Sequence, residues 1–317
     1  MKKLKRERLL NAAILVMGIC ALLFCSGGLV SAQLLNCEGP CKCMDIVLVV
    51  DDTGSMGGAI ANVQLGLADI IAAAQEASIG PAGEDLCLRM GLVSFKDDIE
   101  VDQALTEDMT LVENAVNALS AGGGGPEPEA SDEAVRYVVT GAASADCTVT
   151  GDPPGIGAFR DSTNVECEAL NKIIVLVTDA RPGGCDNLYQ VGVDDVNANE
   201  VAELAFAADP IVISAVFVPT DPNGIYFETI RPIMQYYATA TGGVFSEVGG
   251  DGSGTGAAIE EIIAACGGPP GECAECPESP ECPECDGLDP DAMREEFNEM
   301  RSYMEGLRES LRNRLRR

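Results

Sequence analysis

The chain has 317 residues, and its 51 acidic residues against 20 basic ones give a formal net charge of −31. A surface this acidic repels nucleic acid and anionic membranes. The sequence contains no histidine, which excludes Ser-His-Asp and Cys-His catalysis and every histidine-based metal site.

The first 32 residues are typical of a secretory signal. Five basic residues in "MKKLKRER" precede an apolar run from Leu9 to Val30, and Val30 and Ala32 are the small residues before a cleavage point at Gln33. The run is also long enough to remain as an uncleaved membrane anchor. In either case we expect the rest of the chain to be secreted or to lie in the cell envelope, with no other membrane contact. Cleavage removes five bases and one acid, and it takes the formal charge from −31 to −35.

Four apolar runs rich in β-branched residues predict strands, at residues 46–50, 88–95, 172–179 and 211–218. They lack the alternation of a half-exposed sheet, which indicates strands covered on both faces. Ala-rich and amphipathic segments predict helices at 57–77, 110–120, 129–143, 194–208, 228–240 and 254–265. This order predicts an α/β fold over residues 44–266, with a doubly wound, mainly parallel sheet flanked by helices. Such folds bind ligands at the carboxyl ends of their strands.

Oxygen-bearing side chains follow two of these strands. "DDTGS" at 51–55 follows the first strand, and Asp179 of "VTDARPGG" follows the third. Between them, "AGGGGPEPEASDEAV" at 121–135 predicts a glycine-rich loop that leads into a helix. An oxygen-only set suits a hard cation, Mg²⁺ or Ca²⁺, and is compatible with Mn²⁺. The alternative is an ordinary strand-to-helix turn in which an Asp or Ser caps the next helix.

Residues 45–266 resemble a von Willebrand factor A domain, most closely its hemicentin-like extracellular branch. "DDTGS" resembles the metal-ion-dependent adhesion motif Asp-x-Ser/Thr-x-Ser, and "VTDARP" resembles the later TDG loop of that family. The resemblance implies that Thr53 and Ser55 offer hydroxyl oxygens to the metal. It also implies that Asp51 and Asp179 hold the metal directly or through waters.

The middle loop departs from the family pattern, because no threonine follows the glycines. Counting back from Ala134 places Glu129 at the position of that threonine, with Glu127 as a nearby substitute. A glutamate adds negative charge, so it would hold the metal more tightly and leave it a weaker electrophile toward a ligand carboxylate. Alternatively, both glutamates only favour the positive start of the helix at Ala130, an effect of ~0.3–1 kcal/mol.

Twelve cysteines remain after the signal, an even number that predicts disulfides in an exported chain. Cys37, Cys41 and Cys43 lie in or at the end of a lead-in at 33–43, and Cys266 ends the last predicted helix. Because the ends of a domain often lie close together, we expect a bridge between this amino-terminal group and Cys266.

A second bridge is expected within a turn-rich insertion. Cys147 and Cys167 bracket this insertion, and a disulfide between them would stabilise the fold by ~3 kcal/mol. Cys185, in the loop after the second metal-binding motif, competes for either partner.

The segment 267–288 is rich in Cys, Pro and Glu and reads as a linker. It holds two C-x-x-C pairs, formed by Cys273, Cys276, Cys282 and Cys285. We expect structural or interchain disulfides there, ahead of a zinc site and of thiol-disulfide exchange.

The tail at 289–317 is predicted to form an amphipathic helix and a short parallel coiled coil that makes the protein a homo-oligomer. Its apolar residues follow the a/d spacing of a heptad repeat: Met293, Phe297, Met300, Met304, Leu307 and Leu311. The alternative is a solvated helix that docks on its own domain.

The sequence therefore predicts a non-enzymatic binding or adhesion protein that recognises a protein or glycan ligand through a divalent cation. The main alternative is an envelope or matrix assembly subunit in which the metal only stabilises the loops. A remote alternative is thiol-disulfide exchange or zinc binding at the C-x-x-C pairs.

Overall fold

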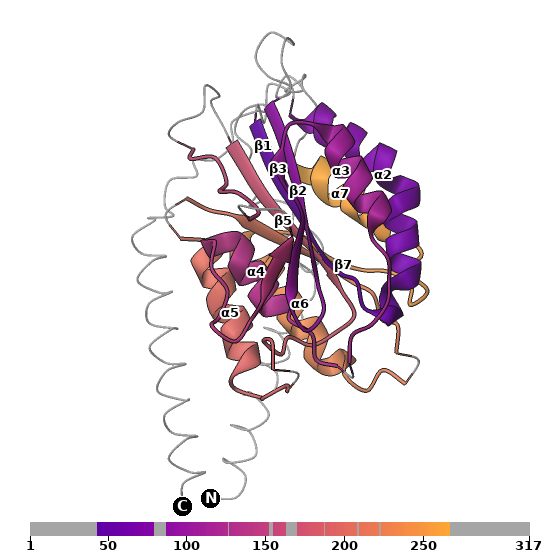
Figure 1. Cartoon of the computed structure of the whole chain (residues 1–317), viewed down its shortest axis with the longest axis vertical. Helices are drawn as coiled ribbons and strands as arrows, with labels where there is room; N and C mark the ends of the chain where they lie inside the picture. Colours follow the sequence, from indigo (N-terminus) through magenta and orange to yellow (C-terminus); the bar gives the residue numbers. More distant parts are fainter. Residues whose placement is uncertain are drawn as a thin grey trace, which may run out of the picture. The chain divides into compact units, whose positions relative to one another are not determined.

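A seven-stranded sheet with helices on both faces forms the core of the protein (Figure 1). The computed structural model describes residues 43–78, 87–125, 127–151, 155–162, 170–186, 188–207, 209–221 and 223–266. The strand order is β4-β3-β2-β1-β5-β6-β7, and every neighbouring pair is parallel except β2 and β3. The strands are β1 (Cys43–Asp51), β2 (Cys87–Phe95), β3 (Ile99–Thr106), β4 (Val149–Gly151), β5 (Leu170–Thr178), β6 (Val212–Phe217) and β7 (Phe245–Glu247). The predicted fold class is confirmed.

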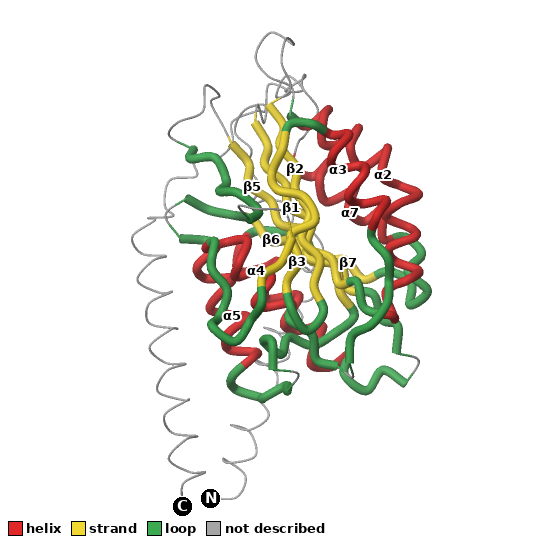
Figure 2. The backbone as a smooth tube through the Cα atoms, in the orientation of Figure 1, coloured by secondary structure: helices red, strands yellow, loops and turns green. Residues whose placement is uncertain are grey.

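The helices divide between the two faces of the sheet (Figure 2). One face carries α2 (Gly57–Ala77), α3 (Met109–Ala118) and α7 (Thr255–Cys266), and the other carries α4 (Ser131–Thr140), α5 (Asp194–Ala205) and α6 (Phe227–Thr241). In β1, Ile46 and Leu48 pack with the first group, whereas Val47 and Val49 pack with the second. Both sides of the strand need apolar residues, which explains why its sequence shows no polar alternation.

The four predicted strands and six predicted helices are all present, with ends that differ by a few residues. The sequence did not predict β3, β4 or β7. β3 reads "IEVDQALT" and is half-exposed over much of its length, and the three residues of β4 are all exposed. Short or polar strands near the edges of a sheet carry little apolar signal.

The helix α2 is unusually apolar. Among the described residues, Gly54–Ala77 is the one helical segment long and apolar enough to cross a membrane, with a mean hydropathy of 1.4. Its apolar residues pack into the core beside the sheet and α7. Gly66 lies against Gly256 of α7, where a Cβ on Gly66 would be 3.4 Å from the Cα of Gly256. We interpret α2 as a core helix of the domain.

Two disulfides lie within the described residues: one removes Cys43 from the expected bridge to Cys266, and the other is the alternative pairing of Cys147. Cys43 pairs with Cys87 instead of Cys266, because β1 and β2 are neighbouring parallel strands that begin in register at these two cysteines. Cysteine spacing alone does not assign Cys87 a partner.

Cys147 pairs with Cys185, the competing partner, instead of Cys167. The chain before β4 therefore lies beside the loop that follows β5. The predicted roles of Cys37, Cys41, Cys167 and the four cysteines at 273–285 fall outside the described residues, as does the tail at 289–317.

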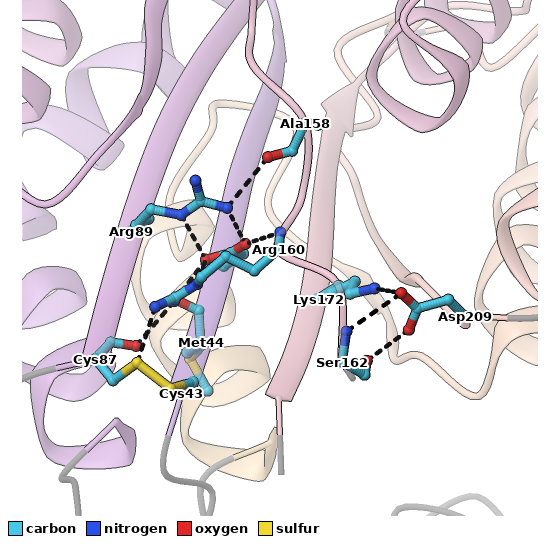
Figure 3. A network of polar contacts seen from close by, with 10 residues as sticks. Cys43, Met44, Cys87, Arg89, Ala158, Arg160, Ser162, Lys172 and Asp209 are labelled. Atoms are coloured by element: carbon cyan, nitrogen blue, oxygen red, sulfur yellow. Dashed lines mark hydrogen bonds and ion pairs between the residues drawn. A yellow bond between two sulfur atoms is a disulfide. The ribbon is translucent and has the colours of Figure 1, made fainter. Parts of the chain in front are cut away.

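A buried polar network holds the amino-terminal ends of the central strands (Figure 3). Asp45 on β1 is fully buried and accepts hydrogen bonds from Nε of Arg89 at 3.0 Å and from Nε of Arg160 at 2.8 Å. Arg160 also donates to Sγ of Cys87 at 2.8 Å. Burial alone would raise the pKa of Asp45, but the bonds from Arg89 and Arg160 outweigh it and lower that pKa.

The same segment, 155–162, is fixed at its other end. Ser162 donates its hydroxyl to Asp209 at 2.5 Å, and Asp209 pairs with the buried Lys172 of β5 (Figure 3). This network therefore fixes the 155–162 segment across the starts of β1, β2 and β5, away from the carboxyl edge of the sheet.

Candidate metal centre

Asp51 is the last residue of β1 and is fully buried at the carboxyl edge of the sheet. Its Oδ1 accepts hydrogen bonds from the backbone N of Thr53 at 3.0 Å and from Oγ1 of Thr53 at 2.7 Å. Its Oδ2 accepts a bond from Oγ1 of Thr178 at 2.7 Å. The carboxylate is therefore held in one orientation by the motif that follows it and by the neighbouring strand β5.

The two hydroxyls of the motif lie side by side. After Thr53 the chain forms a single 3-10 turn, η1 (Gly54–Met56), which brings Oγ of Ser55 to 3.2 Å from Oγ1 of Thr53. Thr53 is buried and Ser55 is exposed. The two hydroxyl oxygens therefore lie at the boundary between the protein interior and solvent, where an ion could reach both.

Asp179 directly follows the carboxyl end of β5, next to Thr178. It accepts a hydrogen bond from the hydroxyl of Thr220, which follows β6. Sequence reasoning missed both threonines as supports of the two aspartates. The sequence does carry a signal for them, because each threonine directly precedes an Asp near the end of a strand. Thr178 lies in "VTD" and Thr220 in "VPTD".

The glycine-rich loop closes over the motif. The backbone N of Gly54 donates to the carbonyl of Gly123 at 3.2 Å. Gly124 has φ +71°, and a Cβ there would lie 2.6 Å from Cγ2 of Thr53 and 3.0 Å from Oε1 of Glu129. Only glycine fits this position, both for its left-handed backbone and for the close approach of these two side chains.

The two glutamates of the middle loop have different surroundings. Glu127 accepts bonds from the backbone N and Nε of Arg181, at 3.0 and 2.9 Å. Glu129 is buried, and its Oε2 has no hydrogen-bond partner among the described residues. Its backbone bridges to the loop after β5, since N of Glu129 donates to the carbonyl of Arg181 at 3.1 Å. Of the two, Glu129 is the acid left to meet a cation.

A cavity of about 320 Å³ opens at this edge of the sheet. Its polar lining includes Thr53, Ser55, Glu129, Asp179 and Thr220. The structure thus gathers Thr53, Ser55, Glu129 and Asp179 around one space, with Asp51 bonded directly behind them.

The carboxylates at this edge repel one another. Burial, followed by the charge of Asp179, raises the pKa of Asp51 to about 7. Burial raises the pKa of Glu129 to about 8, with further contributions from Asp51, Asp97, Asp179 and Glu127. Such shifts arise when charged groups lack a counter-ion, and a divalent cation would supply one.

The donor set fits a hard cation. Within the described ranges, no three Asp, Glu, Cys or His side chains converge closely enough to hold a metal by themselves. A cation would therefore need the hydroxyls of Thr53 and Ser55 together with Asp51 and Asp179, as the motif predicts. Glu129 would complete the set, directly or through a water.

An open α/β sheet with an oxygen-rich loop cluster at its carboxyl edge defines a Rossmann-like domain with a candidate site for a divalent cation. Residues 45–152 match the family profile of the von Willebrand factor A domain. Over this stretch the chain is similar to a von Willebrand factor A domain. No curated protein matches the chain.

Several solved structures are similar to this chain at low sequence identity. BatB from Bacteroides thetaiotaomicron is 13% identical over 70% of this chain and 98% of that protein, with a TM-score of 0.43. The von Willebrand factor domain of the type V pili tip protein Mfa5 from Porphyromonas gingivalis is 12% identical over 71% of this chain and 95% of its own, with a TM-score of 0.45. Proximal thread matrix protein 1 from the mussel byssus, in a structure with a zinc-occupied MIDAS motif, is 15% identical to this chain. The match covers 71% of this chain and 46% of that protein, with a TM-score of 0.44.

Proposed function

We propose that this protein is an exported, non-enzymatic binding protein whose A domain captures a protein or glycan ligand through a divalent cation. Asp51, Thr53, Ser55 and Asp179 hold the cation, and Glu129 completes its surroundings. Mg²⁺ or Ca²⁺ is the expected ion, and Mn²⁺ is compatible with the same oxygens.

The observation that carries this proposal is the open cavity beside the oriented aspartate. The oxygens of Thr53, Ser55, Glu129 and Asp179 line a space that reaches solvent, whereas a purely structural ion needs no access for a second molecule. The raised pKa of Asp51 and the unpartnered oxygen of Glu129 support a cation at the same place.

Two measurements on the full chain test the proposal. Titration calorimetry with Mg²⁺, Ca²⁺ and Mn²⁺ on EDTA-treated protein should reveal one site, and Asp51→Ala and Asp179→Ala should each abolish it. Capture from native envelope or culture supernatant should then be lost in EDTA and in Asp179→Ala. Equal cation binding by wild type and Asp179→Ala contradicts the proposed site.

The structural alternative gives a different result in the same experiments. If the cation raises the melting temperature but no ligand is captured in an EDTA-sensitive manner, the protein is an assembly subunit whose metal stabilises the loops. The export of the chain and its oligomerisation through residues 289–317 belong to this proposal and rest on the sequence patterns alone.

A further inference from the structure

We infer that Glu129 makes this metal centre reject carboxylate ligands and select a ligand that donates an uncharged oxygen. The inference rests on the proposed cation-dependent binding and names the chemistry of the ligand for that site. It follows from where Glu129 lies, from the charges around the cavity and from the apolar residues in its lining.

Glu129 adds a third carboxylate to the centre. Its side chain is buried beside Thr53, and the charges of Asp51 and Asp179 both act on it. With Asp51, Asp179 and Glu129 ionised around one divalent cation, the centre keeps a net charge of −1. A hydroxyl at the position of Glu129 would leave the centre neutral. A ligand carboxylate would therefore meet a neutral site in such a variant, but it meets a negatively charged site in this protein.

The rest of the cavity offers an anion no compensation. Its described lining includes Glu127, Glu129, Asp179 and Asp221 and contains no lysine or arginine. Arg181, the nearest base in the adjoining loop, is already bonded to Glu127. A carboxylate entering this space would therefore meet four acidic side chains and no basic side chain in the described lining.

Arg181 also makes cation–π contacts with two aromatic rings. Its guanidinium carbon lies 4.4 Å from the ring centre of Tyr189 and 3.7 Å from that of Tyr226. The cation–π contacts and the hydrogen bond from its Nε to Glu127 hold the guanidinium, so it cannot turn toward a ligand without losing them.

The apolar part of the cavity lining favours an uncharged ligand. It is formed by Ala180, Tyr226, Phe227 and Ile230. Tyr226 is 36% exposed, and the neighbouring Ile225 is 66% exposed. A hydroxyl pair or an amide carbonyl could bind the cation while the apolar part of the same ligand packs on these side chains.

The test uses Mn²⁺-loaded protein and isosteric probes. Water proton relaxation reports how many waters remain on Mn²⁺ while acetate, acetamide or ethylene glycol is added. Acetate and acetamide have the same shape and differ in charge, and ethylene glycol represents a hydroxyl pair. Titrations compare wild type with Glu129→Thr and Glu129→Gln, and Glu261→Gln on the exposed side of α7 controls for the loss of one negative charge.

Wild type and Glu261→Gln should show no preference for acetate over acetamide. Glu129→Thr and Glu129→Gln should bind Mn²⁺ about tenfold more weakly, equivalent to ~1.4 kcal/mol, and should bind acetate at least about tenfold better than wild type does. Whichever of acetamide and ethylene glycol displaces more water from wild type identifies the donor as carbonyl or hydroxyl.

Acetate binding of equal strength in wild type and both variants overturns the inference while leaving the proposed cation site intact. A preference of wild type for acetate over acetamide overturns it even if neither variant retains Mn²⁺. Failure of wild type to bind any divalent cation is a separate result, which removes the proposed function itself.

Discussion

The ionised forms of Asp51 and Glu129 are energetically unfavourable in the metal-free fold. Both are buried and face other carboxylates, which raises the pKa of Asp51 to about 7 and that of Glu129 to about 8. At neutral pH the metal-free domain therefore keeps protons on part of this cluster. A cation must displace these protons, so metal affinity should increase with pH.

We predict that the metal-free protein becomes less stable as pH rises from about 4 to about 8. In this window the folded state binds more protons at Asp51 and Glu129 than the unfolded state does, so the free energy of unfolding falls with increasing pH. Urea unfolding in EDTA at pH 5 and pH 8 measures the loss, which should amount to a few kcal/mol, on the order of 1.4 kcal/mol per unit of pKa shift.

Saturating Mg²⁺ or Ca²⁺ should reduce or reverse this difference, because the cation stabilises the ionised carboxylates. Asp45 has a lowered pKa, and the stability it contributes is lost only as pH falls below the usual range of an aspartate, outside this window. A metal-free protein that is more stable at pH 8 than at pH 5 would contradict the proposed charge balance.

At the scale of elements, the glycine-rich loop and η1 form one unit. Gly123 and Gly124 both have positive φ, and the loop's backbone contacts the turn after β1 at Gly54 and Asp52. The position of the hydroxyl of Thr53 therefore depends on a loop about seventy residues further along the chain.

Gly124→Ala should weaken divalent-cation binding by tenfold or more. The new methyl group would lie 2.6 Å from Cγ2 of Thr53, and the left-handed backbone adds ~1–2 kcal/mol of strain. Gly122→Ala is the matched control, because a Cβ there meets nothing within 4 Å. Titration calorimetry measures the divalent-cation affinity of both variants. Equal affinities would show that the loop does not position the site.

Much of the fold and of the motif could be predicted from the sequence, because the signals are local. Buried parallel strands appear as continuous apolar runs, and Asp51, Thr53 and Ser55 lie within five residues. The contacts that cross the fold could not be predicted. The pairing of Arg181 with Glu127, which separates the roles of Glu127 and Glu129, depends on how two loops pack.

The missed disulfide partners have the same cause. Cys43 and Cys87 are 44 residues apart, and only the register of β1 against β2 places them together. Cys147 and Cys185 meet because the short segment before β4 lies beside the loop after β5. Cysteine spacing alone carries no information about either arrangement.

For the whole molecule, we predict that the exported protein contains no free thiols. Peptide mapping without reduction should recover the links Cys43–Cys87 and Cys147–Cys185, and thiol titration in denaturant should give no signal. Four reactive thiols accompanied by released zinc would instead assign Cys273, Cys276, Cys282 and Cys285 to a metal site.

We also predict that the chain forms oligomers through residues 289–317. Light scattering should give a mass several times that of a chain ending at Gly267, and joining several A domains could raise avidity by ~10²–10⁴. The truncated chain retains every described element and serves as the control. If both proteins are monomers with oxidised cysteines, the predicted coiled coil does not form.

The described part of the chain begins and ends at the same end of the α/β domain. β1 runs nine residues from Cys43 to Asp51, which separates its start from the carboxyl edge of the sheet by about 26 Å. Gly256 at the start of α7 lies against Asn62 and Gly66 of α2, and α7 ends near Ala77, toward the start of β2. Both ends of the described domain therefore lie away from the carboxyl edge of the sheet, which leaves the candidate cation site clear of the points where the chain continues.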